Sequence, residues 1–252
     1  MAAMKKLLLV IVLLAVIVGG GLVIANLAFD HTRRTTQTVT AAVREIVVKS
    51  GAGDVALIPA GKRLEVRETR HYVLQKPTVK LAVKDGVLTL DSDCDALVLK
   101  CYTDLRVTVP RGVTVTVAAD SGDIDAREID VRSAHMHSDS GDVTLGLVGR
   151  QRLVWAHADS GRVDVIAADA RAVDAQTDSG DLAVDVFKRS PRRVVARSDS
   201  GFVQVVVLKG DYAIKAHSDS GDVTNAGLTR NDRASSSIDA RSDSGDVALR
   251  AR

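Results

Sequence analysis

Seven aspartates stand in the same short segment, Asp-Ser-Gly, along the second half of this 252-residue chain. A row of carboxylates is a ligand set suited to calcium, which is bound by oxygen atoms. Asp also suits a turn, since its side chain accepts a hydrogen bond from the backbone two residues further on. The seven residues, at intervals of 19, 20, 19, 21, 20 and 24, are Asp120, Asp139, Asp159, Asp178, Asp199, Asp219 and Asp243.

The recurring segment indicates stacked structural repeats. Positions counted back from each Gly alternate between small or apolar residues and polar residues, which is the period of a β-strand. About 20 residues are too few for a strand, a crossover helix and a return strand, but enough for one coil with two short strands. We therefore expect an all-β fold, a single-stranded parallel β-solenoid with about 20 residues per coil.

Each Asp-Ser-Gly segment is expected to form the corner between the two strands of a coil. Gly takes positive φ without a steric penalty, and the Asp side chain accepts a local hydrogen bond. The invariant Ser is expected to face a narrow core, which the small residues of the preceding strand also indicate. The motif is then the hinge of each coil.

Stacking in register places neighbouring aspartates about 4.8 Å apart, where two charges repel by about 1 kcal/mol in water. The Gly-Gly-x-Gly-x-Asp unit of the known calcium solenoids does not occur in the chain. We therefore favour a structural corner with compensated charge over a calcium ladder, and expect no metal ion and no cofactor. The compensating residues would stand two positions before each Asp, where the sequence has Ala118, His137, His157, Gln176, Arg197, His217 and Arg241.

Two of these residues, His137 and His157, belong to neighbouring repeats. They could share a zinc ion with Asp139 or Asp159. We favour the alternative, in which the two imidazoles stack on each other in solvent without a metal ion.

Three residues are candidates for contact with a partner. Trp155 and Phe202 occupy positions expected to point outward, and Arg162 and Phe202 replace the usual Asp after the Gly. The basic segment 187–193 could touch anionic wall polymer or lipid headgroups, although a solvated corner is favoured.

The N-terminal segment 1–29 is expected to reach a membrane. Residues 7–25 carry no polar side chain and follow Lys5 and Lys6, a pattern typical of a signal anchor. We expect a single-pass transmembrane helix over 7–29, with the rest of the chain outside the cytoplasm; the alternative is secretion after cleavage near Ala25. The net charge of +2 gives no reason to expect a nucleic-acid partner.

The remaining segments divide as follows. Residues 30–42 are Thr-rich and are expected to form a polar stalk. The solenoid domain spans 43–252 and begins with a degenerate copy of the repeat, followed by an irregular part over about 58–110 and regular repeats over 111–252. Asp85-Gly86 predicts a hairpin between two strands in the irregular part.

Cys94 and Cys101 are the only two cysteines. In an exported domain such a pair can close a small loop as a disulfide, which we favour. Two free buried thiols, or a metal pair that lacks further ligands, are the alternatives.

At the C-terminus, the chain stops at residues 247–252, directly after the last repeat. We expect an open edge there, available for self-association or for an envelope protein.

Several motifs together resemble the bacterial putative-adhesin, or toast-rack, family of β-strand-repeat proteins. They are the Ser-Gly-x-Gly-Asp-Val copy at 50–55, the Val-Pro-x-Gly-Val-x-Val segment at 109–115 and the serial Ser-Gly-Asp-Val units. The resemblance covers about residues 43–252 and implies an extracytoplasmic solenoid with envelope or adhesion roles and no catalytic residues. The chain departs from the unit at Arg162, at Phe202 and in the longer last interval, which contains 229–237.

Three classes of function are open. An interaction or sensing module at the cell envelope is favoured, and a passive adhesin or scaffold is the alternative. A polysaccharide-acting enzyme is disfavoured, because the carboxylates repeat evenly and the whole chain has only seven aromatic residues with which to stack on sugar rings. We expect no enzyme.

Overall fold

The computed structural model describes residues 30–61, 63–94 and 100–252. The transmembrane helix or signal peptide expected over 1–29 lies outside these residues. Within them the chain forms 22 β-strands. The described part has no helix that is long and apolar enough to cross a membrane.

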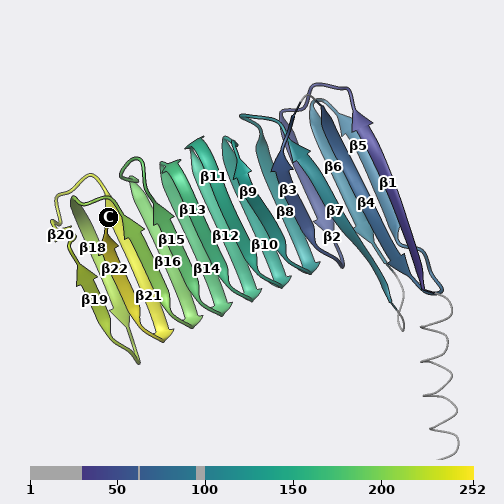
Figure 1. Ribbon diagram of the computed structural model, residues 1–252. Helices are drawn as coiled ribbons and strands as arrows, with labels where there is room; N and C mark the ends of the chain where they lie inside the picture. Colours follow the sequence, from purple (N-terminus) through teal and green to yellow (C-terminus); the bar gives the residue numbers. More distant parts are fainter. Residues whose placement is uncertain (1–29, 62, 95–99) are drawn as a thin grey trace, which may run out of the picture.

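The strands form two sheets of eleven, which lie face to face as the two layers of an elongated stack (Figure 1). Sheet A has the spatial order β1 (His31–Val39), β4 (Leu64–Tyr72), β7 (Cys101–Val109), β3 (Val55–Pro59), β9 (Ile124–Ile129), β11 (Val143–Gln151), β13 (Val163–Ala170), β15 (Leu182–Val186), β17 (Val203–Val207), β22 (Val247–Ala251) and β19 (Val223–Ala226). Sheet B has the order β20 (Thr229–Arg230), β18 (Asp211–Ser218), β21 (Ser237–Ser244), β16 (Arg193–Ser200), β14 (Ala172–Ser179), β12 (Leu153–Ser160), β10 (Ser133–Ser140), β8 (Thr114–Ser121), β2 (Glu45–Ser50), β6 (Val87–Asp93) and β5 (Thr78–Lys84).

Each repeat contributes one strand to each sheet, and the Asp-Ser-Gly segment is the corner between them. In the repeat that contains Asp159, β12 pairs in parallel with β10 and β14, and β13 pairs in parallel with β11 and β15. Equivalent residues of successive repeats are register partners, as at Ala134, Val154 and Val173. The prediction of an all-β fold with repeated strands in parallel sheets is confirmed.

Small residues on sheet B and larger ones on sheet A make the core between the sheets. Ala156, Ala175 and Ala196 form one column of sheet B, while Val165 and Val184 form a column of sheet A, and all five are 0 or 1% exposed. Both columns belong to a single core cluster. A core this thin is closely packed with few aromatic side chains, which agrees with the composition.

The N-terminal end differs from the sequence-based prediction in two respects. The stalk expected over 30–42 is wrong, because residues 31–39 form β1, which pairs antiparallel with β4 at the end of sheet A. The solenoid also extends beyond the degenerate copy formed by β2 and β3, since β6 and β7 make a further coil outside it. The hairpin prediction is confirmed by the antiparallel pair β5 and β6, joined at Asp85 and Gly86. A disulfide joins Cys94 and Cys101, with their Cα atoms 6.1 Å apart.

At the C-terminal end, the spatial order of the coils departs from their order in the chain. The last coil, β21 and β22, lies between β16 and β18 in sheet B and between β17 and β19 in sheet A. The expected open edge at 247–252 is therefore wrong: β22 has a partner on both sides, and the terminal coil is the preceding one, which contains Val223–Ala226.

Candidate functional site

The glycines of the corners stack directly on one another. A Cβ atom at Gly122, Gly141, Gly161, Gly180 or Gly201 would overlap the carbonyl oxygen of the corner Gly in the preceding coil. At Gly161 and Gly201, φ is not positive. The close approach of two backbones is therefore what requires Gly in those coils, and positive φ adds to this requirement in the others.

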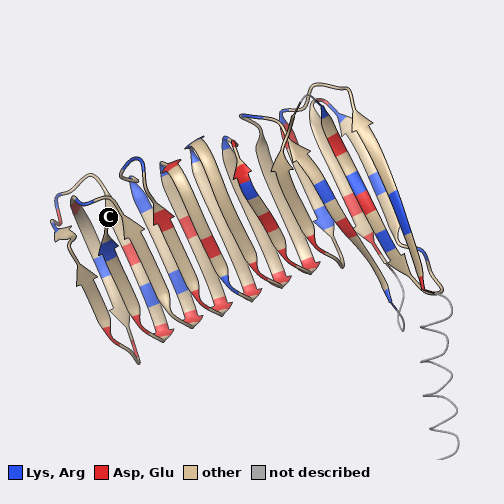
Figure 2. Cartoon of the chain, viewed as in Figure 1, with Lys and Arg blue, Asp and Glu red and all other residues tan. Residues whose placement is uncertain are grey.

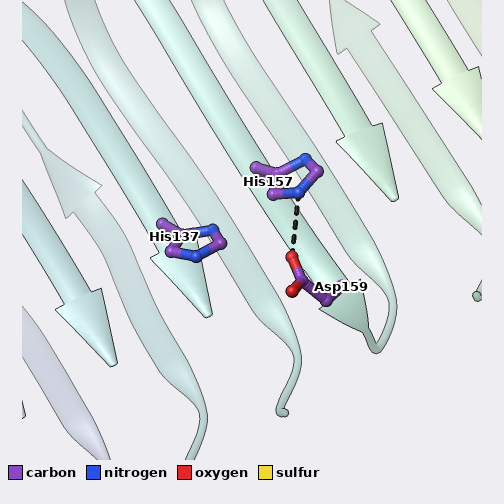
Figure 3. A group of neighbouring side chains, drawn as sticks. All are labelled: His137, His157 and Asp159. Atoms are coloured by element: carbon purple, nitrogen blue, oxygen red, sulfur yellow. Dashed lines mark hydrogen bonds and ion pairs between the residues drawn. The ribbon is translucent and has the colours of Figure 1, made fainter. Parts of the chain in front are cut away.

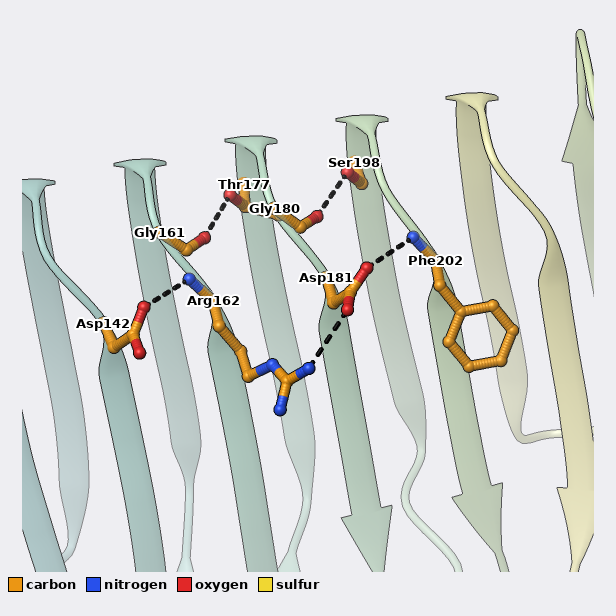
Figure 4. Close-up of polar contacts among 8 residues, drawn as sticks. All are labelled: Asp142, Gly161, Arg162, Thr177, Gly180, Asp181, Ser198 and Phe202. Atoms are coloured by element: carbon orange, nitrogen blue, oxygen red, sulfur yellow. Dashed lines mark hydrogen bonds and ion pairs between the residues drawn. The ribbon is translucent and has the colours of Figure 1, made fainter.

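Buried hydroxyl groups join the coils beside this glycine row. Thr177 donates a hydrogen bond to the carbonyl of Gly161 at 2.8 Å, and Ser198 donates one to the carbonyl of Gly180 at 3.0 Å (Figure 4). These hydroxyl residues stand three positions before their own Gly and are buried. The invariant Ser directly before the Gly is exposed in all seven repeats. The expectation that the invariant Ser faces the core is wrong, because strand alternation ends at the Asp and both corner residues face solvent.

A second row of aspartates, which stand one residue after most of the corner glycines, bonds successive coils together. Oδ1 of Asp142 accepts a hydrogen bond from the backbone N–H of Arg162 at 2.8 Å, and Oδ1 of Asp181 accepts one from Phe202 at 3.0 Å (Figure 4). The N–H of Phe202 and the guanidinium of Arg162 lower the pKa of the Asp181 carboxyl below its usual value. The same inter-coil bond is made by the carboxylates of Asp54, Asp104, Asp123 and Asp246.

The sequence-based reasoning missed this row because the bond crosses from one coil to the next. The available signal was the recurrence of Asp after the Gly, which stands beside the more conspicuous Asp before the Ser. Where Arg162 and Phe202 occupy the position, the next coil has no such carboxylate to bind.

The aspartates of the Asp-Ser-Gly segments behave differently. In the described ranges of the chain, the carboxylates that accept a backbone N–H do not include any of these seven. The predicted local hydrogen bond is therefore not formed. Three of the seven lie instead beside the His two positions earlier, with Nε2 to Oδ1 distances of 2.8, 3.0 and 2.6 Å. The three pairs are His137–Asp139, His157–Asp159 and His217–Asp219.

Two arginines were also expected to compensate the charge of the Asp-Ser-Gly aspartates, but they form ion pairs with a different residue. Arg197 and Arg241 both bind Asp239, at 2.9 and 2.8 Å, rather than Asp199 or Asp243. Burial raises the pKa of Asp239, but the hydrogen bonds from the two arginines outweigh it, so the pKa lies below its usual value. Since Asp239 and Arg241 are both in β21 and Arg197 is in β16, the pair of Arg197 with Asp239 helps to hold the inserted coil against β16.

Replacing Asp142 by Ala is expected to lower the free energy of unfolding by about 1 kcal/mol, since the Arg162 N–H then loses its charged acceptor. Replacing Asp139 by Ala, which removes an exposed carboxylate of the Asp-Ser-Gly row, should change it by less than about 0.5 kcal/mol. Chemical denaturation of the two variants measures the difference. Equal effects would show that the second row has no special structural role.

The three candidate contact residues do not form one patch. Trp155 is half-buried on the outer face of sheet B, where its ring stacks on His157 with centroids 5.8 Å apart. Arg162 and Phe202 lie together in the second row of the corners, on either side of Asp181, to which Arg162 is paired at 3.0 Å (Figure 4). Any partner that uses all three would have to cover the whole corner.

A hollow of about 930 Å³ lies on the outer face of sheet A at its N-terminal end. Its lining includes three arginines, from β1, β4 and β7, and four aspartates. His71 at its edge lies 3.3 Å from Asp104. The mixture of charges favours no particular class of ligand.

An arginine row runs along the corner opposite the aspartates. Arg132, Arg152, Arg171 and Arg192 each stand directly before a strand of sheet B, and all four are exposed. They occupy consecutive coils: the N–H of Arg152 donates to the carbonyl of Arg132, and the N–H of Arg192 donates to that of Arg171. Among the described residues, the ion pairs of arginine include none of these four.

The two corners differ in charge along the long edges of the solenoid, although the edge with the arginine row also carries Asp130 and Asp169. The ends of the sheet B strands carry a line of acidic residues, and basic residues lie in loops at the other edge (Figure 2). Beside the arginine row, a smaller hollow of about 250 Å³ is lined by Arg150 and Arg189 together with Arg171, Arg192 and Asp169. A lone carboxylate among four guanidinium groups leaves this hollow positively charged.

Comparisons with known proteins agree with the fold. Among solved structures, the chain is similar to the putative adhesin from Parabacteroides distasonis, at 12% identity and a TM-score of 0.50, with 86% of this chain and 97% of that chain covered. It is also similar to the putative adhesin from Bacteroides fragilis, at 15% identity and a TM-score of 0.46, covering 87% and 97%. A third match is the putative lipid binding protein from Parabacteroides distasonis, at 13% identity and a TM-score of 0.43, covering 87% and 96%.

At such low identity these structures concern the fold alone. A comparison with curated proteins finds no match. The family model described as Toastrack DUF4097 matches residues 38–251, which include all but one of the strands in full. On this match, with the stacked two-strand coils behind it, the chain belongs to the Toastrack DUF4097 family.

Proposed function

We propose that this protein is a non-catalytic interaction module on the outer side of the bacterial cell envelope, and that it binds an extended anionic polymer along the arginine row. The row is the observation that carries the proposal. Four exposed guanidinium groups in consecutive coils, about 4.8 Å apart along the axis, match a chain of regularly spaced anionic groups better than a compact ligand. Fold neighbours named as adhesins are compatible with such a role.

The localisation is part of the proposal and rests on the apolar segment over 7–25 and on the disulfide between Cys94 and Cys101. Disulfides form and persist in oxidising compartments outside the cytoplasm. A membrane anchor at the N-terminus would hold the solenoid near the envelope polymers. A passive scaffold remains the second candidate, favoured only by the regularity of the coils.

Binding of polyphosphate, as a probe for an extended polyanion, tests the proposal. The variant with Arg132, Arg152, Arg171 and Arg192 replaced by Gln is expected to lose at least tenfold in affinity. Its measured binding should also depend less steeply on salt, since fewer charges are neutralised. A control with the same change in net charge replaces Arg33, Arg127, Arg230 and Arg233, which are exposed elsewhere.

The control variant should stay within about twofold of the parent protein, because its arginines do not form a row. Equal losses in both variants would mean that net charge alone drives binding. No saturable binding of polyphosphate by the parent protein would favour the passive scaffold.

A further inference from the structure

Two histidines and an aspartate on the outer face of sheet B lie close enough together to share one metal ion. His137 in β10 and His157 in β12 are register partners in neighbouring parallel strands. Asp159 follows His157 by two residues and so projects from the same face. Ligand atoms of the three side chains all lie within 4.8 Å of one another (Figure 3).

The two imidazoles are held in place by their surroundings. Their rings stack with centroids 5.2 Å apart and an angle of 18° between the planes. Nε2 of His137 lies 2.8 Å from Oδ1 of Asp139, and Nε2 of His157 lies 3.0 Å from Oδ1 of Asp159. Nδ1 of His137 is buried and has no hydrogen-bond partner among the residues that the structure describes. In both rings Nε2 is the nitrogen that faces an aspartate, and so it is the nitrogen that a shared metal ion would reach.

We propose that His137, His157 and Asp159 bind a transition-metal dication of the zinc and copper class. Imidazole and carboxylate donors suit these metals, whereas calcium prefers oxygen alone. Tetrahedral zinc with bonds near 2.0 Å needs ligand atoms about 3.3 Å apart. The three side chains are partly exposed, so rotation about their own torsions is the movement that would bring the ligand atoms to that spacing.

The site is bounded on both sides along the solenoid. Ala118 is the register partner of His137 on one side, and Gln176 is the register partner of His157 on the other. Neither is a ligand for zinc, so the pair of histidines marks one place and not a continuous ladder.

The chain contains a natural control for this arrangement. His217 lies 2.6 Å from Asp219 and repeats the His-x-Asp pairing in β18. Its register partner is Arg241, whose charge opposes the approach of a cation. One His–Asp pair beside an arginine is not expected to bind the metal.

The only tryptophan of the chain provides a reporter at the site. Trp155 stacks on His157 with ring centroids 5.8 Å apart and lies 6.3 Å from His137. Bound Cu²⁺ quenches the fluorescence of a nearby indole, whereas Zn²⁺ does not. Displacement of Cu²⁺ by Zn²⁺ would therefore restore the signal.

The experiment titrates the full chain, purified in detergent without a polyhistidine tag, with Cu²⁺ while Trp155 fluorescence is recorded. Zn²⁺ affinity is then measured by calorimetry and by competition. His137→Gln and His157→Gln are each expected to weaken binding of both metals at least tenfold. His217→Gln should leave both affinities within twofold. Melting curves establish that each variant stays folded, and Zn²⁺ should raise the melting temperature of the parent protein but not of His157→Gln.

A further variant tests whether Zn²⁺ binding can be strengthened. Gln176→His places a third imidazole in register with His157 and is expected to strengthen Zn²⁺ binding at least tenfold. The proposal is overturned if no saturable binding of either metal occurs. It is also overturned if His217→Gln weakens binding as much as His157→Gln does, or if Cu²⁺ binds without quenching Trp155.

Discussion

Replacing Gly161 by Ala is expected to destabilise the solenoid by about 3 kcal/mol, or to prevent folding of the coils around it. The added Cβ would overlap the carbonyl oxygen of Gly141, and the backbone there cannot yield without breaking the strand pairing of both sheets. Because φ at Gly161 is not positive, the effect comes from the contact between coils and not from backbone strain. Chemical denaturation or thermal melting of the variant measures the loss.

Gly61 is the matched control, since a Cβ at this position meets no atom of the described residues within 4 Å and φ is not positive. Gly61→Ala should leave the free energy of unfolding unchanged or raise it by up to about 1 kcal/mol. The reason is that Ala lowers the conformational entropy of the unfolded chain. A Gly161→Ala variant as stable as the Gly61→Ala variant would mean that the coils can separate at this corner. The stacked glycines would then not set the spacing of the solenoid.

The glycine row also explains what the sequence could and could not predict about the corner. Strand periodicity and the 20-residue interval are properties of one coil, so they predicted the two strands and the position of the turn correctly. The roles of the corner residues depend on the neighbouring coil. Gly161 packs on Gly141, Thr177 donates to Gly161, and Asp142 accepts from Arg162, and each of these contacts needs the register to be known.

The N-terminal strand β1 shows a different limit of prediction from sequence. Residues 31–39 are almost all exposed, with no column of apolar side chains, so nothing in the pattern distinguishes an edge strand from a polar stalk. The strand forms because β4 offers an edge, with which all nine residues of β1 pair. Such a strand is fixed by its partner, since its own side chains bury little.

The candidate metal site was visible in the sequence as two histidines 20 residues apart. What the structure adds is their register, the stacking on Trp155 and the buried Nδ1 of His137. The arginine row had a comparable signal, because its members stand nine residues before the Gly of their coils, at intervals of 20, 19 and 21. The sequence-based reasoning followed the repeat only to the seventh residue before the Gly and so missed it.

The order of the C-terminal coils was beyond prediction for a physical reason. Ala196, Ala240 and Ala216 occupy the same column in three successive strands of sheet B. Coils that present the same small side chain to their neighbours pack equally well in either order. The preference for one order must then come from features outside the repeat, which a prediction based on the repeat does not weigh.

Cysteines introduced together at positions 197 and 241 are expected to form a disulfide, whereas cysteines at 197 and 217 are expected to remain reduced. Arg197 and Arg241 are register partners in adjacent strands, and His217 is the partner of Arg241 on its far side. Two strand spacings separate 197 from 217, about 10 Å, which is too far for a disulfide. With sequential coils the outcome would be reversed, because β18 would then lie beside β16.

Mass spectrometry of non-reduced peptides after mild oxidation identifies the bonds that form, and the native pair Cys94 and Cys101 serves as the internal reference. The expected difference is nearly all or none, because the two pairs share the half-buried position 197, their other positions 217 and 241 are both exposed, and they differ mainly in distance. Efficient cross-linking of 197 to 217 would contradict the inserted position of β21. It would return residues 247–252 to the end of the solenoid, where an open edge could dock a partner. If only 197 and 241 cross-link, the edge that could dock a partner lies instead at the coil of β18 and β19. All four residues of β19, Val223–Ala226, are exposed.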